Sequence, residues 1–311
     1  MKNWNNLVDS YTRYCEMRGL SESTVKQRER FLFKFGLWLR GKGQSRKSIQ
    51  DLDERIVLQY LKHCSRYKSK STTFGRISIL NGFGDWLCIE GHWEKNPIKW
   101  IERPKLNAHR QVPKVHNRKQ LIRVYQETFN HHVYIFKKLY PAAFIILYST
   151  GIRKSELIDL SLDDWDEVER TLKISGSKVS VERVVPLPKD AVHIVQCYLS
   201  ERSKLLLSKG ITSEKSFFIN RTGSPLTGDQ VWRGLRNAAL RAGVESFKLH
   251  NLRHNCTTDL LESGVHITKV QKLLGHSCLE STFRYTHITD ENRASAMAKH
   301  PLNDILGVTH E

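Results

Sequence analysis

Apolar side chains recur at the spacing of an α-helix through most of the first hundred residues, and the alternation expected of strands is nearly absent there. A polar loop, 41–48, separates the second apolar stripe from the third. Helices with one apolar face must bury those faces against one another, so the pattern predicts an N-terminal helical bundle. The four stripes are Leu7, Tyr11 and Tyr14; Val25, Phe31, Leu32, Phe35, Trp38 and Leu39; Ile56, Val57, Tyr60 and Leu61; and Ile77, Ile79, Leu80, Phe83, Trp86 and Leu87.

A polar, basic segment bracketed by Pro104 and Pro113 follows this bundle. Such a composition is typical of a linker, because prolines and charged side chains neither extend a helix nor enter a core. A chain of 311 residues is also long for one compact domain. We therefore expect a helical domain at 1–105, a linker at 106–114 and a second domain at 115–311 that ends in a helical tail.

The second part of the chain mixes helices with a little β structure. The apolar run 140–148 predicts a buried helix, which Gly151 would end in the left-handed cap conformation. Residues 171–174 and 183–187 flank a polar turn and predict a hairpin, and 217–219 predicts another short strand. The predicted fold is mainly α with a small β-sheet, namely an N-terminal helical bundle and a C-terminal α+β domain.

Helix boundaries in this second part have signals of their own. Three pairs of residues have the spacing of a capping box, and three glycines are placed to stop a helix. The pairs are Thr227 with Gln230, Thr268 with Gln271 and Ser277 with Glu280, and the glycines are Gly243, Gly264 and Gly275.

The charge balance indicates the kind of partner. The chain has 50 Lys and Arg against 32 Asp and Glu, a formal net charge of +18. Solubility needs far less charge, so the excess indicates a polyanionic partner. Both parts of the chain have an excess of basic residues. Residues 1–105 have 21 basic and 11 acidic residues, and the remainder has 29 basic and 21 acidic residues. No polybasic stretch adjoins an apolar anchor, which favours nucleic acid over a membrane surface.

The six cysteines are widely scattered and form no Cys-x-x-Cys pair, so neither a zinc ribbon nor a redox motif is expected. The chain start lacks the apolar core of a signal peptide, and no apolar run is long enough to span a membrane. These features predict a reduced protein of the cytoplasm that associates with the nucleoid. The cysteines are Cys15, Cys64, Cys88, Cys197, Cys256 and Cys278.

Arg153 is the first candidate for chemistry. It directly follows the predicted helix stop, so its guanidinium would leave a turn at the edge of the core, where it could bind two phosphate oxygens. Glu156, three residues later, could orient it. Taken alone, an ordinary surface arginine at a helix corner is the more common explanation.

His250 and Arg253 form a second candidate pair. Residues three apart share a helix face, and two donors near a helix start suit an anion. His250 and His254 also have the spacing of metal ligands, but the adjacent glutamate of the zinc-protease pattern and a third ligand are missing, which disfavours a zinc hydrolase. A solvated helix start remains an alternative for each residue.

Three later positions extend the set. His276 follows a predicted helix stop, where it could cap the helix or donate to the same anion. Tyr285 is either a core or interface tyrosine or a nucleophile, and its phenol, with a pKa near 10, would then need strong positive charge nearby. Lys178 lies at the hairpin turn, where it is either solvated or a proton donor to a leaving alkoxide.

The order and spacing of five blocks carry more information than any single residue. The blocks are Thr-Gly-Ile-Arg-x-Ser-Glu-Leu, a hairpin lysine before Glu-Arg-Val-Val-Pro-Leu, His-x-x-Arg-His, Leu-Leu-Gly-His-Ser and Arg-Tyr-Thr-His, all within about 150–290. Together they resemble the signature of the tyrosine recombinase (integrase) family, with spacing close to that of Xer-type members. Lys178 departs from many relatives, because Ser177 and Val179 flank it in place of glycines, and the other candidate, Lys173, lies inside the β-like segment.

The resemblance implies a site-specific recombinase that cuts and rejoins DNA through a 3′-phosphotyrosyl intermediate, with neither metal nor nucleotide cofactor. It implies a SAM-like core-binding domain at 1–105 and a catalytic domain in the second part. Tyr285 is the implied nucleophile. The implied activating residues are Arg153, Lys178, His250, Arg253 and His276.

Double-stranded DNA is the implied partner, bound by four protomers on two duplexes, and a related recombinase or accessory factor could take part. The rival functions are a type IB topoisomerase, which the basic helical first domain disfavours, and a non-catalytic DNA-binding protein, which the complete set of six polar residues disfavours. The target site is not encoded in these motifs. Residues expected to contact DNA, although a solvated basic face has the same pattern, are Lys26, Arg28, Arg30, Arg66, Lys68, Lys70 and Arg76.

Overall fold

The structure is a computed structural model in which the chain divides into two compact units, residues 1–109 and 110–311. Each unit is described by itself. The predicted linker, 106–114, lies outside the described residues. The described residues are 2–41, 52–65, 70–102, 115–176 and 181–275.

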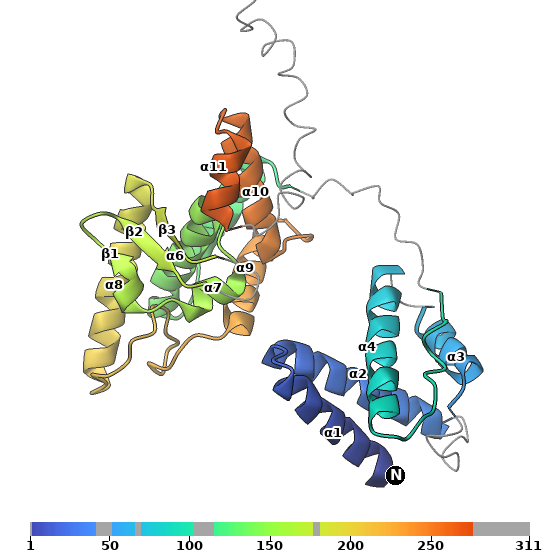
Figure 1. Cartoon of the computed structure of the whole chain (residues 1–311). Coiled ribbons are helices and arrows are strands. Elements are labelled where there is room, and N and C mark those ends of the chain that lie inside the picture. The colour runs from blue at the N-terminus through green and yellow to red at the C-terminus, as the bar shows by residue number, and fades with distance from the viewer. Residues whose placement is uncertain (1, 42–51, 66–69, 103–114, 177–180, 276–311) are drawn as a thin grey trace, which may run out of the picture. The chain divides into compact units, whose positions relative to one another are not determined.

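Unit 1 is helical throughout its described part, as the apolar stripes predict (Figure 1). Helix α1 packs on α2, and α4 contacts both α2 and α3. The predicted apolar faces join into one core, in which Tyr11, Leu32 and Phe83 are almost completely buried. The helices are α1 (Lys2–Met17), α2 (Glu22–Gly41), α3 (Glu54–Ser65) and α4 (Lys70–Ile89).

Unit 2 is built around α6 (Tyr134–Thr150), which extends beyond the predicted run 140–148 at both ends. Its residues are buried on nearly all sides, because the surrounding helices cover it. Gly151 ends α6 with a φ of 63°, the predicted left-handed cap, and its N–H donates to the Leu147 carbonyl. The surrounding helices are α5 (Arg118–Thr128), α7 (Lys154–Asp159), α8 (Lys189–Ser208), α9 (Gly228–Arg241) and α10 (Leu249–Glu262).

A small antiparallel sheet, in the order β1-β2-β3, completes unit 2. The predicted hairpin is confirmed as β2 (Thr171–Ile174) and β3 (Arg183–Pro186), with Leu172 opposite Val185. A two-residue strand, β1 (Trp165–Asp166), adds an edge that the pattern did not indicate. The inner face of the sheet joins the same core as α6. The mainly helical fold with a small sheet is therefore confirmed.

The predicted strand at 217–219 is wrong. This segment is buried, but within the described chain it forms a single isolated bridge, between Ile219 and Pro225. Its Phe217 N–H donates to the Leu160 carbonyl, so consecutive residues bond to different segments and no continuous ladder forms.

Of the two predicted capping boxes that lie in the described residues, one is confirmed and one is wrong. Thr227 and Gln230 form the predicted reciprocal capping box at the start of α9. Helix α11 (Ile267–Leu274) begins before the predicted box at Thr268, and the His266 ring accepts the Thr268 N–H in its place. The pair Ser277 and Glu280 lies outside the described residues. Positive φ angles at Gly243, Gly264 and Gly275, just after α9, α10 and α11, confirm the three predicted stops.

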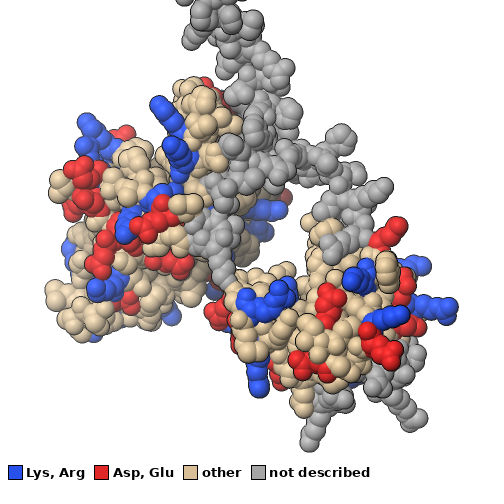
Figure 2. Space-filling model, viewed as in Figure 1, with Lys and Arg blue, Asp and Glu red and all other residues tan. Residues whose placement is uncertain are grey.

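Among the described residues on the face shown in Figure 2, basic side chains do not gather into a separate patch. Figure 2 shows Lys and Arg side chains interspersed with Asp and Glu over both units. Among the described helices, none is long and apolar enough to cross a bilayer.

Candidate active site

Arg153 is held by its own helix. It is the N-cap residue of α7, directly after the turn at Gly151. Its backbone N–H donates to Glu156 Oε2 (2.8 Å), and its Nη1 donates to Glu156 Oε1 (2.9 Å). Both bonds are local, because residues three apart meet at a helix start. The predicted orientation of Arg153 by Glu156 is therefore confirmed.

Arg253 is almost fully buried in the first half of α10. Its Nη1 donates to the Gly151 carbonyl (2.6 Å), and its Nη2 donates to the Leu274 carbonyl (2.9 Å). Burial lowers the pKa of Arg253 to about 10, with repulsion from Arg153 and Arg183 as a further cause. The guanidinium consequently stays charged at neutral pH and fixes the turn before α7 to the end of α11.

A third arginine, Arg183, joins this group from β3. Its Nη2 donates to Glu156 Oε2 (3.0 Å), its Nη1 to Glu156 Oε1 (3.3 Å) and its Nε to the Leu273 carbonyl (2.8 Å). Sequence reasoning placed Arg183 in the hairpin and assigned it no role. The signal was the strand alternation, because Arg183 shares a face with buried Val185, and a buried arginine needs an acidic partner.

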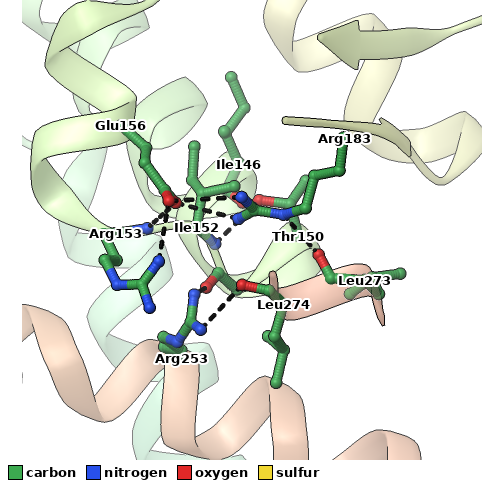
Figure 3. A network of polar contacts seen from close by, with 10 residues as sticks. Ile146, Thr150, Ile152, Arg153, Glu156, Arg183, Arg253, Leu273 and Leu274 are labelled. Carbon is green, nitrogen blue, oxygen red and sulfur yellow. Dashed lines mark hydrogen bonds and ion pairs between the residues drawn. The ribbon is translucent and has the colours of Figure 1, made fainter. Parts of the chain in front are cut away.

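Two of the arginines, Arg153 and Arg183, bind the Glu156 carboxylate, and Arg253 lies beside them and binds backbone carbonyls, as Figure 3 shows. We call Arg153, Glu156, Arg183 and Arg253 the arginine cluster. It contains three cations and one anion, a net charge of +2. The Glu156 side chain is only 4% exposed, whereas that of Arg153 is 26% exposed and can reach a ligand. A partly buried excess of positive charge with guanidinium donors suits a phosphate group.

Of the remaining predicted residues, the structure describes His250 alone. His250 lies one turn before Arg253 on α10 and is exposed, and its ring contacts that of His254 with 4.4 Å between the ring centroids. Lys178, His276 and Tyr285 lie outside the described residues. Of the six predicted residues, the structure thus brings Arg153 and Arg253 together in one cluster and places His250 on the same helix as Arg253.

Unit 1 contains a basic groove between α2 and α4. Three residues predicted to contact DNA line it, Lys26, Arg30 and Arg76, together with Lys34. The Arg76 guanidinium lies over the Phe31 ring at 5.8 Å, and its Nη1 is buried without a hydrogen-bond partner in the described chain.

Arg28, another predicted contact, is not among the described residues that line this groove. Arg28 is half-buried and donates to the Tyr11 hydroxyl through Nη1 (2.7 Å). Lys70 is the first residue of α4. Arg66 and Lys68 lie outside the described residues.

His116 anchors the start of unit 2 to α10. Its backbone N–H donates to Asn255 Oδ1 (3.1 Å), and Asn255 Nδ2 donates to its carbonyl (2.6 Å). Its Nε2 lies 3.1 Å from Asn251 Nδ2, and its ring stacks on Phe247. Because both asparagines flank Arg253 on α10, this contact positions the helix that bears the buried arginine. Burial lowers the pKa of the His116 imidazole below its usual 6.5.

His116 makes the stability of unit 2 depend on pH. Its pKa is lower in the folded state than in the unfolded state, so the unfolded state binds more protons between the two values. The free energy of unfolding should be highest above pH 6.5 and fall as the pH drops below it. Urea unfolding at about pH 7.5 and about pH 5 would measure the fall. It should be smaller in His116→Gln, and an equal fall in both proteins would contradict this assignment.

No group of three or more His, Cys, Asp or Glu side chains that could hold a metal ion occurs in the part of the chain that the structure describes. The donors of the arginine cluster are cationic, and cations do not coordinate metal ions. Its chemistry is therefore that of an anion site.

Residues 114–292 match the phage integrase family. A tyrosine recombinase XerD of Oceanobacillus iheyensis is 32% identical over 275 residues, which cover 88% of this chain and 90% of the relative. A tyrosine recombinase XerD of Staphylococcus haemolyticus is 28% identical over 288 residues, which cover 91% of this chain and 94% of the relative.

Solved structures share the fold. The XerH site-specific recombinase bound to a palindromic difH substrate in a post-cleavage complex has a TM-score of 0.70 and 21% identity, over 91% of this chain and 81% of that one. The lambda integrase tetramer bound to a Holliday junction has a TM-score of 0.68 and 18% identity, over 90% of this chain and 76% of that one.

Proposed function

The chain belongs to the phage integrase family of tyrosine recombinases, and on this premise we propose that it is a site-specific recombinase that cuts and rejoins DNA through a 3′-phosphotyrosyl intermediate. The observation that carries the proposal is the arginine cluster, with its net charge of +2 and one partly exposed guanidinium. Arg253 binds the Leu274 carbonyl at the end of α11, where Gly275 is the C-cap residue. His276 is the next residue in the sequence.

The chemistry proceeds in two exchanges of one phosphodiester bond for another. Tyr285 gives up its phenol proton to solvent and attacks the scissile phosphorus. The bond from phosphorus to the 5′-oxygen breaks, and the 5′-oxygen leaves with a proton from Lys178. The phosphate is then bonded to Tyr285 and to the 3′ end of the cut strand. A 5′-hydroxyl of a partner strand attacks the same phosphorus, which joins new strands and releases Tyr285. Because each bond replaces another of the same kind, no nucleotide is consumed.

Charge stabilisation is the task of the remaining residues. The transition state gathers negative charge on the non-bridging oxygens, where fixed donors lower the barrier most. Arg153 is suited to bind these oxygens, because its Nε and Nη2 donate to no residue of the described chain. Arg253 supplies buried positive charge behind it. His250 and His276 complete the donor set in this proposal.

The basic groove of unit 1 is the proposed contact for the DNA backbone. Lys26, Arg30, Lys34 and Arg76 place four cations along one groove. Phosphate oxygens are acceptors of the right charge, and such contacts release counterions from DNA. Unit 1 would then hold the duplex on which unit 2 acts.

We expect Arg30→Gln combined with Lys34→Gln to weaken binding to duplex DNA. Each lost phosphate contact lowers the slope of log affinity against log salt concentration by about 0.9, so the slope should fall by about 2. Both side chains are exposed, so the urea midpoint should not change. Fluorescence anisotropy at several salt concentrations measures the slope. Lys95→Gln with Lys99→Gln removes the same charge outside the groove and should leave the slope unchanged; a fall as large in this control would contradict the groove assignment.

The assembly follows from the reaction. Exchange between two duplexes needs four cleavages, one for each strand, and each protomer has one Tyr285. The lambda integrase, which shares the fold, is a tetramer on a Holliday junction. We therefore propose four protomers on two duplexes, acting at the nucleoid, with a related recombinase or accessory factor as an additional partner where the protein alone does not complete exchange.

The test is a plasmid with two direct copies of a target duplex, which is first selected from a random pool by its retention on the full-length protein. Site-specific recombination converts the plasmid into two smaller circles, and the expected result is this product in buffer with EDTA. Relaxed plasmid without recombinant circles would instead identify a topoisomerase. Retention of the duplex without a covalent complex or any change in the plasmid would identify a non-catalytic DNA-binding protein.

A further inference from the structure

Arg183 has the contacts of a residue that holds other parts of the site in place. It is the only member of the described arginine cluster on the sheet, and its side chain is 8% exposed. It reaches two separate segments at once, the Glu156 carboxylate on α7 and the Leu273 carbonyl at the end of α11. Neither segment is adjacent to it in the sequence.

The two contacts have different consequences. The Leu273 carbonyl is one of the last carbonyls of α11, which have no partner within the helix, and Arg183 and Arg253 bind two consecutive ones. The left-handed turn at Gly275 follows immediately, and a Cβ there would lie 2.7 Å from Arg183 Nη1. The end of α11 is thus closely fitted to the Arg183 side chain, and this end leads directly to His276.

The contact between Arg183 and Glu156 determines how much of the positive charge of the Arg153 guanidinium is available to a ligand. Without Arg183, the Glu156 carboxylate would pair more closely with Arg153, and a paired guanidinium has less positive field for a ligand. Among the described residues, Arg183 donates two guanidinium hydrogen bonds to the carboxylate and Arg153 donates one. Arg153 therefore keeps a single side-chain bond to Glu156, which fixes its direction, and the cluster keeps its net charge of +2.

We propose that Arg183 is a positioning residue for strand cleavage: acting through Glu156 and the Leu273 carbonyl, it holds Arg153 and the end of α11 in the arrangement that phosphate binding requires. This inference rests on the proposed function. Arg183 itself is turned away from solvent and bonded to protein groups, so it acts on the reacting phosphate through its neighbours.

The test measures the single-turnover rate of covalent complex formation by the full-length protein on a nicked duplex of its selected target. Arg183→Met should slow cleavage about 10- to 100-fold, the effect of a small misplacement of catalytic groups, while DNA affinity changes less than about 2-fold. Arg183→Lys retains the charge but cannot span both contacts, so its rate should lie between those of Arg183→Met and wild type.

A double-mutant cycle separates positioning from a general structural role. Because part of the effect of Arg183 passes through Arg153, the change Arg183→Met should slow cleavage by a clearly smaller factor in an Arg153→Ala background than in the wild-type protein, and the remaining effect belongs to the end of α11. Arg202→Met is the matched control, because Arg202 is also a buried arginine and donates to the carbonyls of Glu214 and Ser216 away from the cluster. It should lower thermal stability and leave the cleavage rate of the folded protein unchanged.

Each outcome decides the inference. A wild-type rate in Arg183→Met, full additivity with Arg153→Ala, or an equal loss in Arg202→Met would overturn it. If Arg183→Met does not fold by circular dichroism, Arg183→Lys decides, because slow cleavage with normal DNA binding supports the inference and a wild-type rate overturns it. Absence of the covalent complex in the wild-type protein would instead count against the proposed function.

Discussion

Tyr285→Phe is expected to abolish the covalent protein–DNA complex. The substitution removes the oxygen that the proposed mechanism bonds to phosphorus and leaves the ring in place, so the rate should fall by more than about 10⁴-fold, on the scale of a removed nucleophile. Binding to the same duplex should persist, because phosphate contacts elsewhere supply the affinity. The measurement is a denaturing gel of the full-length protein with a labelled nicked duplex in buffer containing EDTA.

A second tyrosine serves as the control for this prediction. Tyr134 is 59% exposed at the start of α6, so Tyr134→Phe removes a hydroxyl of the same kind without disturbing the core. It should form the complex at the wild-type rate. A complex that survives in Tyr285→Phe would mean that another side chain is the nucleophile.

Glu156→Gln is expected to cause the largest loss of stability. It keeps the size of the side chain and its capping bond but leaves Arg153, Arg183 and Arg253 without an anion among them. Removing one partner of a buried ion pair costs about 3–5 kcal/mol, and the low exposure of Glu156 and Arg183 places this variant in that class. Urea unfolding of the two proteins at neutral pH measures the difference in the free energy of unfolding.

A surface ion pair provides the comparison. Glu127 pairs with Arg241 at 2.9 Å, and both side chains are about one-third exposed. Glu127→Gln should cost less than about 1 kcal/mol, because water and salt screen an exposed pair. Sulfate should narrow the gap between Glu156→Gln and wild type more than chloride at equal ionic strength, because an anion can replace the lost carboxylate. Equal losses in the two glutamine variants would show that the cluster is not an electrostatic unit.

Local features of the site could be predicted from the sequence because their partners are close along the chain. Arg153 and Glu156 are three residues apart at a helix start, so their pairing follows from helix geometry. Gly151 ends the buried helix because only glycine adopts its left-handed conformation without strain. The hairpin around Lys178 also followed from local alternation, although Lys178 itself lies outside the described residues.

Predictions from local sequence patterns were wrong where contacts with other segments determined the structure. The segment 217–219 has strand-like residues, but its partners lie in different segments, so no ladder forms. The start of α11 has a capping-box spacing at Thr268, yet the His266 ring provides the cap two residues earlier. In both cases the tertiary contacts selected one of several local possibilities.

The sequence by itself therefore determined the helical first part, the hairpin, the family signature and the local pairing of Arg153 with Glu156, because each depends on periodicity or on neighbours within one turn. The tertiary structure decided the arginine cluster. Arg183 and Glu156 are 27 residues apart, and Arg253 meets the Gly151 carbonyl across 102 residues. Such contacts depend on how the sheet, α7, α10 and α11 pack together, and no periodicity along the chain encodes them.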